Sequence, residues 1–234
     1  MRDFSAMTPT QAVFTPDIEL AVCGRVWKLT RRADVESLWA QMGEGDFDED
    51  ERLPYWTELW PAGVALCSWL FRKRDAIRGH VCVDMGCGLG LTALVAQWLG
   101  ARVLAMDYEP EALRYARENA ACNEVASPFW TVMDWRRPAL ASRCARYVWG
   151  GDIMYESRFA APILDFMEHV LAPGACAWVA EPGRSVYDAF RSVLHSRGWA
   201  GRCVYEQSVE ALYAQSVPVT ARIWELTREE RWGR

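Results

Sequence analysis

The feature that most constrains the fold is a regular alternation of short apolar runs and amphipathic helical patterns, which begins at Val81. The successive apolar runs in this part of the chain lie at residues 81–85, 102–106, 128–133, 146–151 and 175–180. Between them, apolar residues recur at spacings of three and four, which is typical of helices that bury one face. Apolar strands separated by helices indicate a mostly parallel sheet with helices on both of its faces.

The C-terminal part of the chain adds two β-rich runs, at 203–213 and 217–226. With these runs the sheet is expected to have seven strands. We therefore predict an α/β fold with a three-layer, doubly wound and mostly parallel seven-stranded sheet. A helix that includes Ile163 and Val170 is expected to end at Pro173-Gly174, because neither residue favours a helix interior.

The N-terminal part of the chain has a different pattern, and we expect residues 1–53 to form an extension to a main domain at 54–234. Residues 18–30 alternate loosely between apolar and polar, which predicts a β-hairpin, and residues 33–42 predict a short helix. The acidic segment 43–52 indicates an exposed loop, with a recruitment site for a basic partner as the alternative.

A helix is expected to begin near Trp60 or Pro61. Proline fits the first turn of a helix and disrupts its interior, so the helical pattern that continues to Phe71 has its start here. This start leaves Trp60 at the mouth of the helix instead of on its packed face.

Composition and charge narrow the class of protein. Hydrophobic residues make up 51% of the 234 residues, which is ample for a core. The net charge of −5, without a run of lysine or arginine, disfavours nucleic acid as a partner. The N-terminus lacks a secretory signal, and the longest apolar stretch is far shorter than the roughly 20 residues of a membrane span. We expect a monomeric, cytoplasmic protein without a membrane partner.

The spacing of cysteine and histidine predicts neither disulfides nor a metal site. None of the eight cysteines belongs to a Cys-x-x-Cys pair, and most lie in apolar runs. The three histidines are near neither one another nor a cysteine pair. Buried, reduced thiols are therefore the expected state of the cysteines.

The glycine-rich segment at 84–90, Asp-Met-Gly-Cys-Gly-Leu-Gly, follows a predicted strand and precedes a predicted helix. Its alternate glycines let the backbone turn sharply and approach a ligand closely. Asp107 ends the next strand, where an acid can bind ribose hydroxyls. A dinucleotide site would need glycine where Leu91 stands, and a carboxylate at Asp84 repels phosphate. These residues predict a ligand with ribose, an adenine-like ring and positive charge, and without phosphate.

This arrangement resembles the class I S-adenosylmethionine-dependent methyltransferases, which have a Rossmann-like fold. The segments 59–63, 133–135 and 151–156, the last with an Asp-x-x-Tyr pattern, look like the protein-lysine methyltransferase group called family 16. Glu-Pro-Gly-Arg at 181–184 and Ile-Trp-Glu-Leu at 223–226 are most similar to the branch that methylates the β subunit of electron-transfer flavoprotein. The branch usually has aspartate at the position of Glu181, and Cys87 is also a variant.

The resemblance implies a set of residues that bind S-adenosylmethionine. They are Trp60, Asp84, Gly86, Cys87, Gly88, Gly90, Asp107, Tyr108, Asp134, Trp135 and Gly151. Asp84 is expected to face the cofactor's amino group and Asp107 its ribose, with Glu109 as the alternative acid. Asp134 and Trp135 are expected to meet the adenine, although Trp135 can also be a core residue.

Asp152 and Tyr155 are the residues we expect to act in catalysis. They follow the fourth strand, at the edge where open α/β sheets bind ligands. A carboxylate here can bind an incoming amine, and a tyrosine can line its pocket. The alternative for Asp152 is an exposed helix cap. For Arg184, the sequence leaves two roles open: it can orient a substrate or cap a turn.

The function that these residues imply is S-adenosylmethionine-dependent transfer of a methyl group, with lysine in a protein substrate as the expected acceptor. The β subunit of electron-transfer flavoprotein is the candidate substrate that the resemblance suggests. The alternatives are a small-molecule N- or O-methyltransferase, a scaffold that binds the cofactor without turnover, and a dehydrogenase of similar fold.

Overall fold

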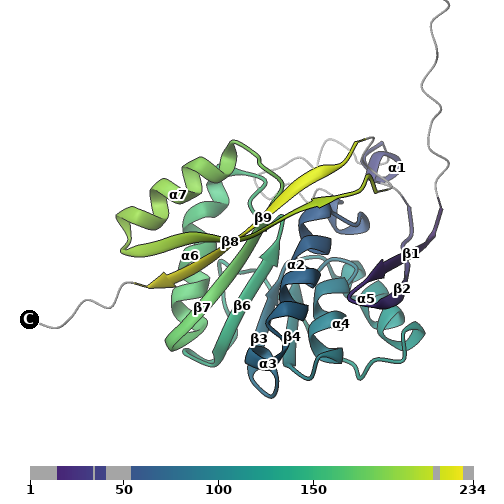
Figure 1. The fold of residues 1–234 in the computed structure, drawn as a ribbon, viewed down its shortest axis with the longest axis horizontal. Coiled ribbons are helices and arrows are strands. Elements are labelled where there is room, and N and C mark those ends of the chain that lie inside the picture. Colours follow the sequence, from purple (N-terminus) through teal and green to yellow (C-terminus); the bar gives the residue numbers. More distant parts are fainter. Residues whose placement is uncertain (1–14, 34, 41–53, 213–216, 229–234) are drawn as a thin grey trace, which may run out of the picture.

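The computed structural model describes residues 15–33, 35–40, 54–212 and 217–228 (Figure 1). Seven strands form the main sheet, in the order β5-β4-β3-β6-β7-β9-β8. Their bounds are Val81–Met85 (β3), Arg102–Asp107 (β4), Phe129–Val132 (β5), Ala145–Gly151 (β6), Leu171–Glu181 (β7), Trp199–Val209 (β8) and Val219–Arg228 (β9). Strands β3 to β7 run parallel, and β9 runs antiparallel to both β7 and β8. The predicted three-layer, mostly parallel sheet is confirmed.

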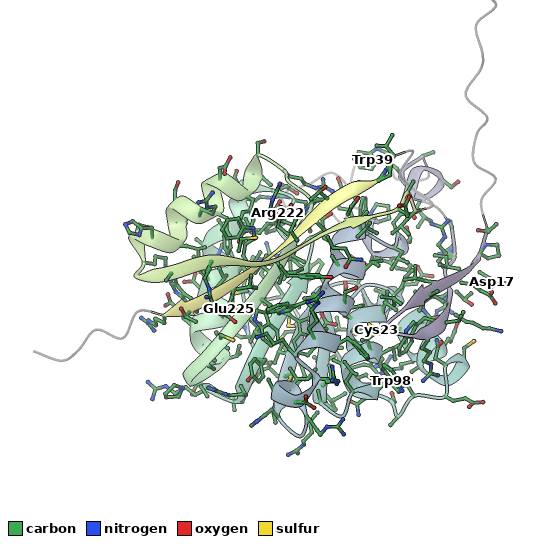
Figure 2. All side chains as sticks on the ribbon, viewed as in Figure 1. Asp17, Cys23, Trp39, Trp98, Arg222 and Glu225 are labelled. Atoms are coloured by element: carbon green, nitrogen blue, oxygen red, sulfur yellow. The ribbon has the colours of Figure 1, made fainter. Side chains whose placement is uncertain are left out.

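Helices cover both faces of this sheet, and side chains fill the space on either side of it (Figure 2). One layer consists of α2 (Pro61–Arg72), α4 (Leu91–Trp98) and α5 (Pro110–Cys122), with the short α3 (Arg74–Ile77) after α2; the other consists of α6 (Ala160–Val170) and α7 (Val186–Ser196). In β3, Cys82 joins the core on the first side and Val83 the core on the second, and both are fully buried. This two-sided burial is why the parallel strands are apolar throughout.

Element boundaries differ from the sequence prediction at several places, most clearly in β7 and β8. Helix α6 ends at Val170 and β7 begins at Leu171, so Pro173 and Gly174 lie inside a strand instead of in a helix-ending turn. The register between β6 and β7 shifts at this point, and such an irregularity accommodates a proline that cannot donate a ladder hydrogen bond. Strand β8 begins at Trp199, earlier than predicted, because Gly198 has a positive φ and returns the chain to the sheet at once.

The N-terminal hairpin is confirmed as β1 (Asp17–Val22) and β2 (Arg25–Thr30). Both turn residues, Cys23 and Gly24, have positive φ, which is the turn that matches the twist of paired strands. Helix α1 (Val35–Trp39) is shorter than the helix predicted over 33–42, whose last two residues lie outside the described residues. The acidic segment 43–52 also lies outside them, and the domain boundary at 53 stays a prediction.

Asn119 in α5 and Asn123, the C-cap residue of that helix, bind the edge of β2 that does not pair with β1. The side-chain amide of Asn123 accepts from the N–H of Lys28 at 2.9 Å and donates to its carbonyl at 2.6 Å. Asn119 accepts from the N–H of Thr30 at 2.7 Å, and its amide nitrogen donates to the carbonyls of Thr30 at 3.4 Å and Leu89 at 3.0 Å. Each side chain therefore serves β2 as a neighbouring strand would, and it fixes the hairpin beside the main sheet.

The described residues contain no helix that is long and apolar enough to cross a bilayer. All eight cysteines are free thiols, and burial raises the pKa of Cys67 and Cys87 well above the ordinary value. Within the described part of the chain, no group of three or more His, Cys, Asp or Glu side chains is arranged to hold a metal ion.

We expect Asn123→Ala to lower the free energy of unfolding by about 1–3 kcal/mol, because both backbone groups of Lys28 lose their partner. Asn123→Asp should cost at least as much, since a carboxylate cannot donate to the Lys28 carbonyl. Urea unfolding followed by circular dichroism measures both. Glu118→Ala, on the exposed side of α5, is the control, and its free energy of unfolding should stay within about 0.5 kcal/mol of that of the parent protein. An equally small effect at Asn123 would contradict the role given to its amide.

Candidate active site

A pocket lies at the carboxyl ends of β3, β4 and β6. The strand order changes direction here, since β4 and β6 flank β3 on opposite sides, and open α/β sheets bind ligands at such a point. The residues that line it come from four regions: Tyr55, Trp56, Glu58, Leu59, Trp60 and Gly63; Gly86, Cys87, Gly88, Leu89, Leu91 and Thr92; Asp107, Tyr108, Glu109 and Trp135; and Gly151, Asp152, Ile153, Tyr155 and Arg184. Ten of the thirteen predicted site residues are among them.

The glycine loop forms the floor of the pocket in a backbone conformation that few other residues adopt. Gly86, Gly88 and Gly90 all have positive φ. A Cβ at Gly88 would lie 3.3 Å from the carbonyl oxygen of Trp56, and one at Gly90 would lie 2.9 Å from the Cβ of Ala116. The absence of a side chain at Gly88 therefore leaves space between the glycine loop and Trp56, in the segment before α2. Its absence at Gly90 lets α4 begin close to α5, so Gly90 has a structural role outside the pocket lining.

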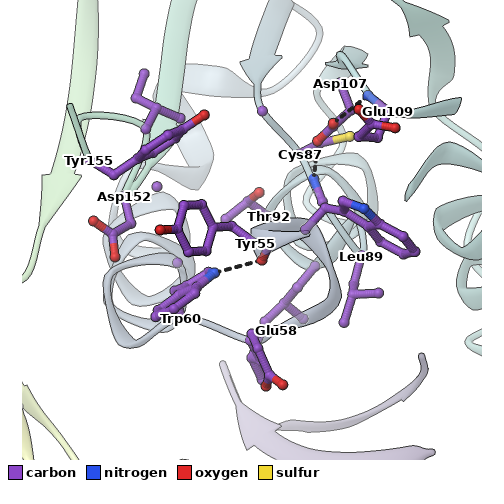
Figure 3. Close-up of a pocket in the computed structure, with 18 of the residues that line it drawn as sticks. Tyr55, Glu58, Trp60, Cys87, Leu89, Thr92, Asp107, Glu109, Asp152 and Tyr155 are labelled. Carbon is purple, nitrogen blue, oxygen red and sulfur yellow. Dashed lines mark hydrogen bonds between the residues drawn. The ribbon is translucent and has the colours of Figure 1, made fainter. Parts of the chain in front are cut away.

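Asp107 joins the end of β4 to the glycine loop. Its Oδ2 accepts from the backbone N–H of Gly88 at 2.8 Å, and its Oδ1 accepts from the N–H of Glu109 at 3.0 Å (Figure 3). Burial raises the pKa of Asp107, and the backbone donors partly offset this effect. Asp107 is 8% exposed as a residue and lines the pocket, so the predicted contact with a ribose has the position it needs.

Asp84 and Asp134 do not line the pocket. Asp84 is fully buried behind the glycine loop, and its Oδ2 accepts from the hydroxyl of Thr92 at 2.6 Å. Burial raises the pKa of Asp84 to about 7, and the hydrogen bond from Thr92 opposes this rise. Asp134 pairs with Arg136 at 2.8 Å. The predicted contacts of these two acids with the cofactor stay predictions.

Asp152 and Tyr155 lie at the other end of the pocket, where β6 ends. Gly151 comes so close to the first turn of α2 that a Cβ there would lie 3.1 Å from the Cα of Gly63. Asp152 then adopts φ 55°, a left-handed conformation that is uncommon for a residue with a side chain and often marks a functional site. Its backbone N–H donates to the carbonyl of Ala180 at 2.8 Å, and its side chain is 5% exposed.

Aromatic rings form the wall around this end of the pocket. The ring of Tyr55 lies 5.2 Å from that of Tyr155 and 5.9 Å from that of Trp60, measured between centroids. The Trp60 indole donates to the carbonyl of Tyr55 at 2.9 Å. Trp60 is the N-cap residue of α2, as predicted from Pro61. Figure 3 shows Asp152, Tyr155, Tyr55 and Trp60 on one side of the pocket, opposite Cys87 and Asp107.

A buried ion pair holds the segment before α2 in place. Arg31, which follows the hairpin, donates to the carboxylate of Glu58, and the two side chains are 3% and 2% exposed. Glu58 itself lines the pocket. The hairpin is thereby connected to the wall that carries Tyr55 and Trp60.

Several pocket residues were absent from the predicted site: Tyr55, Trp56, Glu58, Leu59, Gly63, Leu89, Leu91, Thr92 and Ile153, with Glu109 and Arg184 predicted only as alternatives. The sequence did contain a clue to the residues that precede Trp60. A residue at the mouth of α2 lies at the ligand edge of the sheet, so the aromatic residues just before Trp60 have to lie there as well. For Thr92, the first turn of the helix after the glycine loop was the available clue.

Comparison with known proteins agrees with this geometry. The family model described as Ribosomal protein L11 methyltransferase (PrmA) matches residues 65–169. The electron transfer flavoprotein beta subunit lysine methyltransferase of Xenopus laevis is 28% identical over 215 residues, or 87% of this chain and 78% of that protein. The protein of the same name from Rattus norvegicus is 30% identical over 146 residues, or 61% of this chain and 55% of that protein.

Solved methyltransferase structures share the fold. TYW2 from P. horikoshii, in complex with MeSAdo, has a TM-score of 0.54 at 16% identity and covers 92% of this chain and 72% of its own. The magnesium protoporphyrin IX methyltransferase (ChlM) from Synechocystis PCC 6803, with bound SAM, has a TM-score of 0.57 at 16% identity, over 83% of this chain and 91% of its own. The chain is a class I S-adenosylmethionine-dependent methyltransferase. The resemblance seen in the glycine loop is confirmed.

The pocket of this methyltransferase fits S-adenosylmethionine. A Cβ at Gly86 or Gly88 would narrow the pocket against Ile153 or Trp56, and this part of the pocket is where the methionine part of the cofactor is expected. Asp107 offers a carboxylate for the ribose hydroxyls, and Trp135 and Tyr108 offer ring faces for the adenine. The acids near the loop suit a ligand that carries positive charge and no phosphate.

We expect Asp84→Asn to remove a pH dependence from the stability of the free protein. The pKa of Asp84 is raised from 3.8 to about 7, so the folded state binds this proton more tightly than the unfolded chain does. The stability that the proton provides is complete below about pH 4 and is lost as the pH rises to about 7. Between about pH 5 and about pH 8.5, the free energy of unfolding of the variant should therefore rise relative to that of the parent protein, by on the order of 2–3 kcal/mol.

Urea unfolding at the two pH values measures this difference. Asp188→Asn, at an exposed position of α7, is the matched control and should follow the parent protein. If Asp84→Asn and the parent protein show parallel pH profiles, the raised pKa of Asp84 is wrong.

Proposed function

We propose that this methyltransferase transfers a methyl group to the side-chain amine of lysine in a protein substrate. The observation that carries the proposal is that Asp152 and Tyr155 line the same pocket as the glycine loop and Asp107. A buried carboxylate among aromatic rings suits an amine and its methylated product. The frog and rat relatives, which are named as lysine methyltransferases, support this acceptor, and the PrmA family model supports a protein substrate.

The chemistry requires alignment of the amine and removal of a proton from it. S-adenosylmethionine supplies a methyl group that is already activated by its positively charged sulfur. A lysine ammonium has no lone pair, and its ordinary pKa is about 10.4. Burial in this pocket disfavours the ammonium, so the proton passes to solvent more easily. Asp152 then accepts an N–H bond from the amine and directs its lone pair.

Tyr155 contributes a neutral phenol. Burial is the largest cause that raises the pKa of Tyr155, and the nearby carboxylate of Asp107 adds to it. The hydroxyl therefore keeps its proton and can bond to the amine nitrogen. With Tyr55 and Trp60, it also excludes water from the reacting groups.

The β subunit of electron-transfer flavoprotein is the substrate that we propose to test first, because the relatives in frog and rat carry its name. The cytoplasmic location, the monomeric state and the absence of a nucleic-acid partner stay predictions.

Labelling identifies the acceptor. The protein is incubated with radiolabelled S-adenosylmethionine and either cell lysate or recombinant flavoprotein β subunit, and labelled peptides are mapped by mass spectrometry. We expect label on lysine. Label on small metabolites alone would support a small-molecule methyltransferase instead, and cofactor binding without any transfer would support a scaffold.

We expect Asp152→Asn to lower turnover by about 100-fold or more, while the Kd for S-adenosylhomocysteine changes less than about threefold. Asparagine tolerates the left-handed backbone at this position, so the variant isolates the loss of charge. Calorimetry and the labelling assay measure the two quantities, with Asp188→Asn as control. Equal losses of binding and turnover would make Asp152 a cofactor-binding residue.

A further inference from the structure

The guanidinium of Arg184 engages the carboxylate that we propose binds the amine. Arg184 Nη2 donates to Asp152 Oδ2 at 2.9 Å, and the guanidinium carbon lies 5.6 Å from the centroid of the Trp60 ring. Among the described residues, no other side chain donates a hydrogen bond to Asp152. Arg184 therefore donates to one carboxylate oxygen of Asp152, and the other oxygen can accept a hydrogen bond from the amine of the substrate.

The turn that carries Arg184 is itself fixed by Glu181, at the end of β7. One carboxylate oxygen of Glu181 accepts from the N–H of Gly183, and the other accepts from the indole of Trp224 at 3.2 Å. Gly183 has φ 84°, which a residue with a side chain rarely adopts. The backbone of the turn before Arg184 is thus tied to β7 and β9, and the Arg184 side chain, which is 43% exposed, reaches from this turn to Asp152.

Other ionisable groups also surround this end of the pocket. They are Glu181 at the end of β7, Arg222 on β9, Tyr155, Glu156 and Arg158 after β6, Tyr55 and Glu58 before α2, and Asp107 and Glu109 after β4.

Several of these acids already have an arginine beside them. Glu156 pairs with Arg158 at 2.7 Å, Glu58 pairs with buried Arg31, and Glu181 lies 4.0 Å from Arg222. Asp152 has Arg184 as its corresponding partner. The charge that an incoming amine meets at Asp152 therefore depends on Arg184.

We propose that Arg184 acts through Asp152 to select the neutral form of the acceptor amine, by offsetting the carboxylate charge while leaving it able to accept a hydrogen bond. This inference rests on the proposed lysine acceptor. An unbalanced carboxylate would stabilise the ammonium and hold its proton in place. With Arg184 present, the ammonium gains little from Asp152, whereas the neutral amine still gains a hydrogen bond. The released proton passes to solvent, and the nitrogen keeps the lone pair that attacks the methyl carbon.

The electrostatics of the carboxylate agree with this role. Burial raises the pKa of Asp152, the nearby charge of Glu181 adds to this, and Arg184 opposes both. Arg184 thus helps to keep Asp152 ionised and able to accept a hydrogen bond. It is a positioning residue, because it acts on the amine through Asp152.

The test is the pH dependence of kcat at saturating acceptor, which reports the ionisation of the bound amine. Recombinant flavoprotein β subunit is the acceptor. Arg184→Met keeps the length of the side chain and removes its charge. In this variant the unopposed carboxylate of Asp152 favours the ammonium, so we expect the acid limb of the kcat–pH profile to move to higher pH by about one unit. The kcat should then be about tenfold lower near pH 7.5 and should recover at high pH. Arg184→Lys should restore the limb of the parent protein.

Arg202→Met is the matched control. Arg202 forms a similar pair with Glu225, at 3.0 Å, on the antiparallel strands away from the pocket. Its profile should coincide with that of the parent protein. A loss in Arg184→Met that is equal at every pH, or an unmoved acid limb, would overturn the proposal and assign Arg184 a purely geometric role.

A second measurement needs no acceptor. Carbon-13 NMR of the Asp152 carboxyl should give a higher pKa in Arg184→Met than in the parent protein, and an unchanged value would also overturn the inference. Failure of the proposed function looks different. The parent protein would then label no lysine in any protein, and the inference would fall with it even if the carboxyl pKa moved as expected.

Discussion

The hydrogen bonds from the backbone of Gly88 and Glu109 to the Asp107 carboxylate organise the rest of the site. The bond from Gly88 connects the end of β4 to the loop that follows β3, so the loop cannot move away without removing one of the donors to a buried carboxylate. The glycine loop is thus held in its positive-φ conformation before any ligand arrives. Pre-organisation of this kind reduces the entropy that a bound nucleoside has to overcome.

Much of the fold follows from local patterns in the sequence. The strands of the parallel sheet are recognisable because both faces are buried, and the start of α2 is recognisable because Pro61 fits only a first turn. The glycine loop and Asp107 could be placed for the same reason. Each follows directly after a strand, and strands of a parallel sheet end at a common edge.

The parts that the sequence could not predict depend on partners far apart along the chain. Arg31 and Glu58 each resemble an ordinary surface charge until the hairpin brings them together inside the protein. Asn119 and Asn123 lie in a helix pattern that does not reveal a strand beside it. Arg184 could not be assigned because its role depends on the left-handed turn at Asp152, and no spacing in the sequence indicates where that side chain points.

The amide of Asn119 connects two parts of the protein that are far apart in the sequence, the N-terminal hairpin and the glycine loop. It bonds both to Thr30, in the hairpin, and to the carbonyl of Leu89, in the glycine loop. One side chain therefore supports both the seating of the hairpin and the shape of the glycine loop, so its loss would disturb two parts of the protein at once.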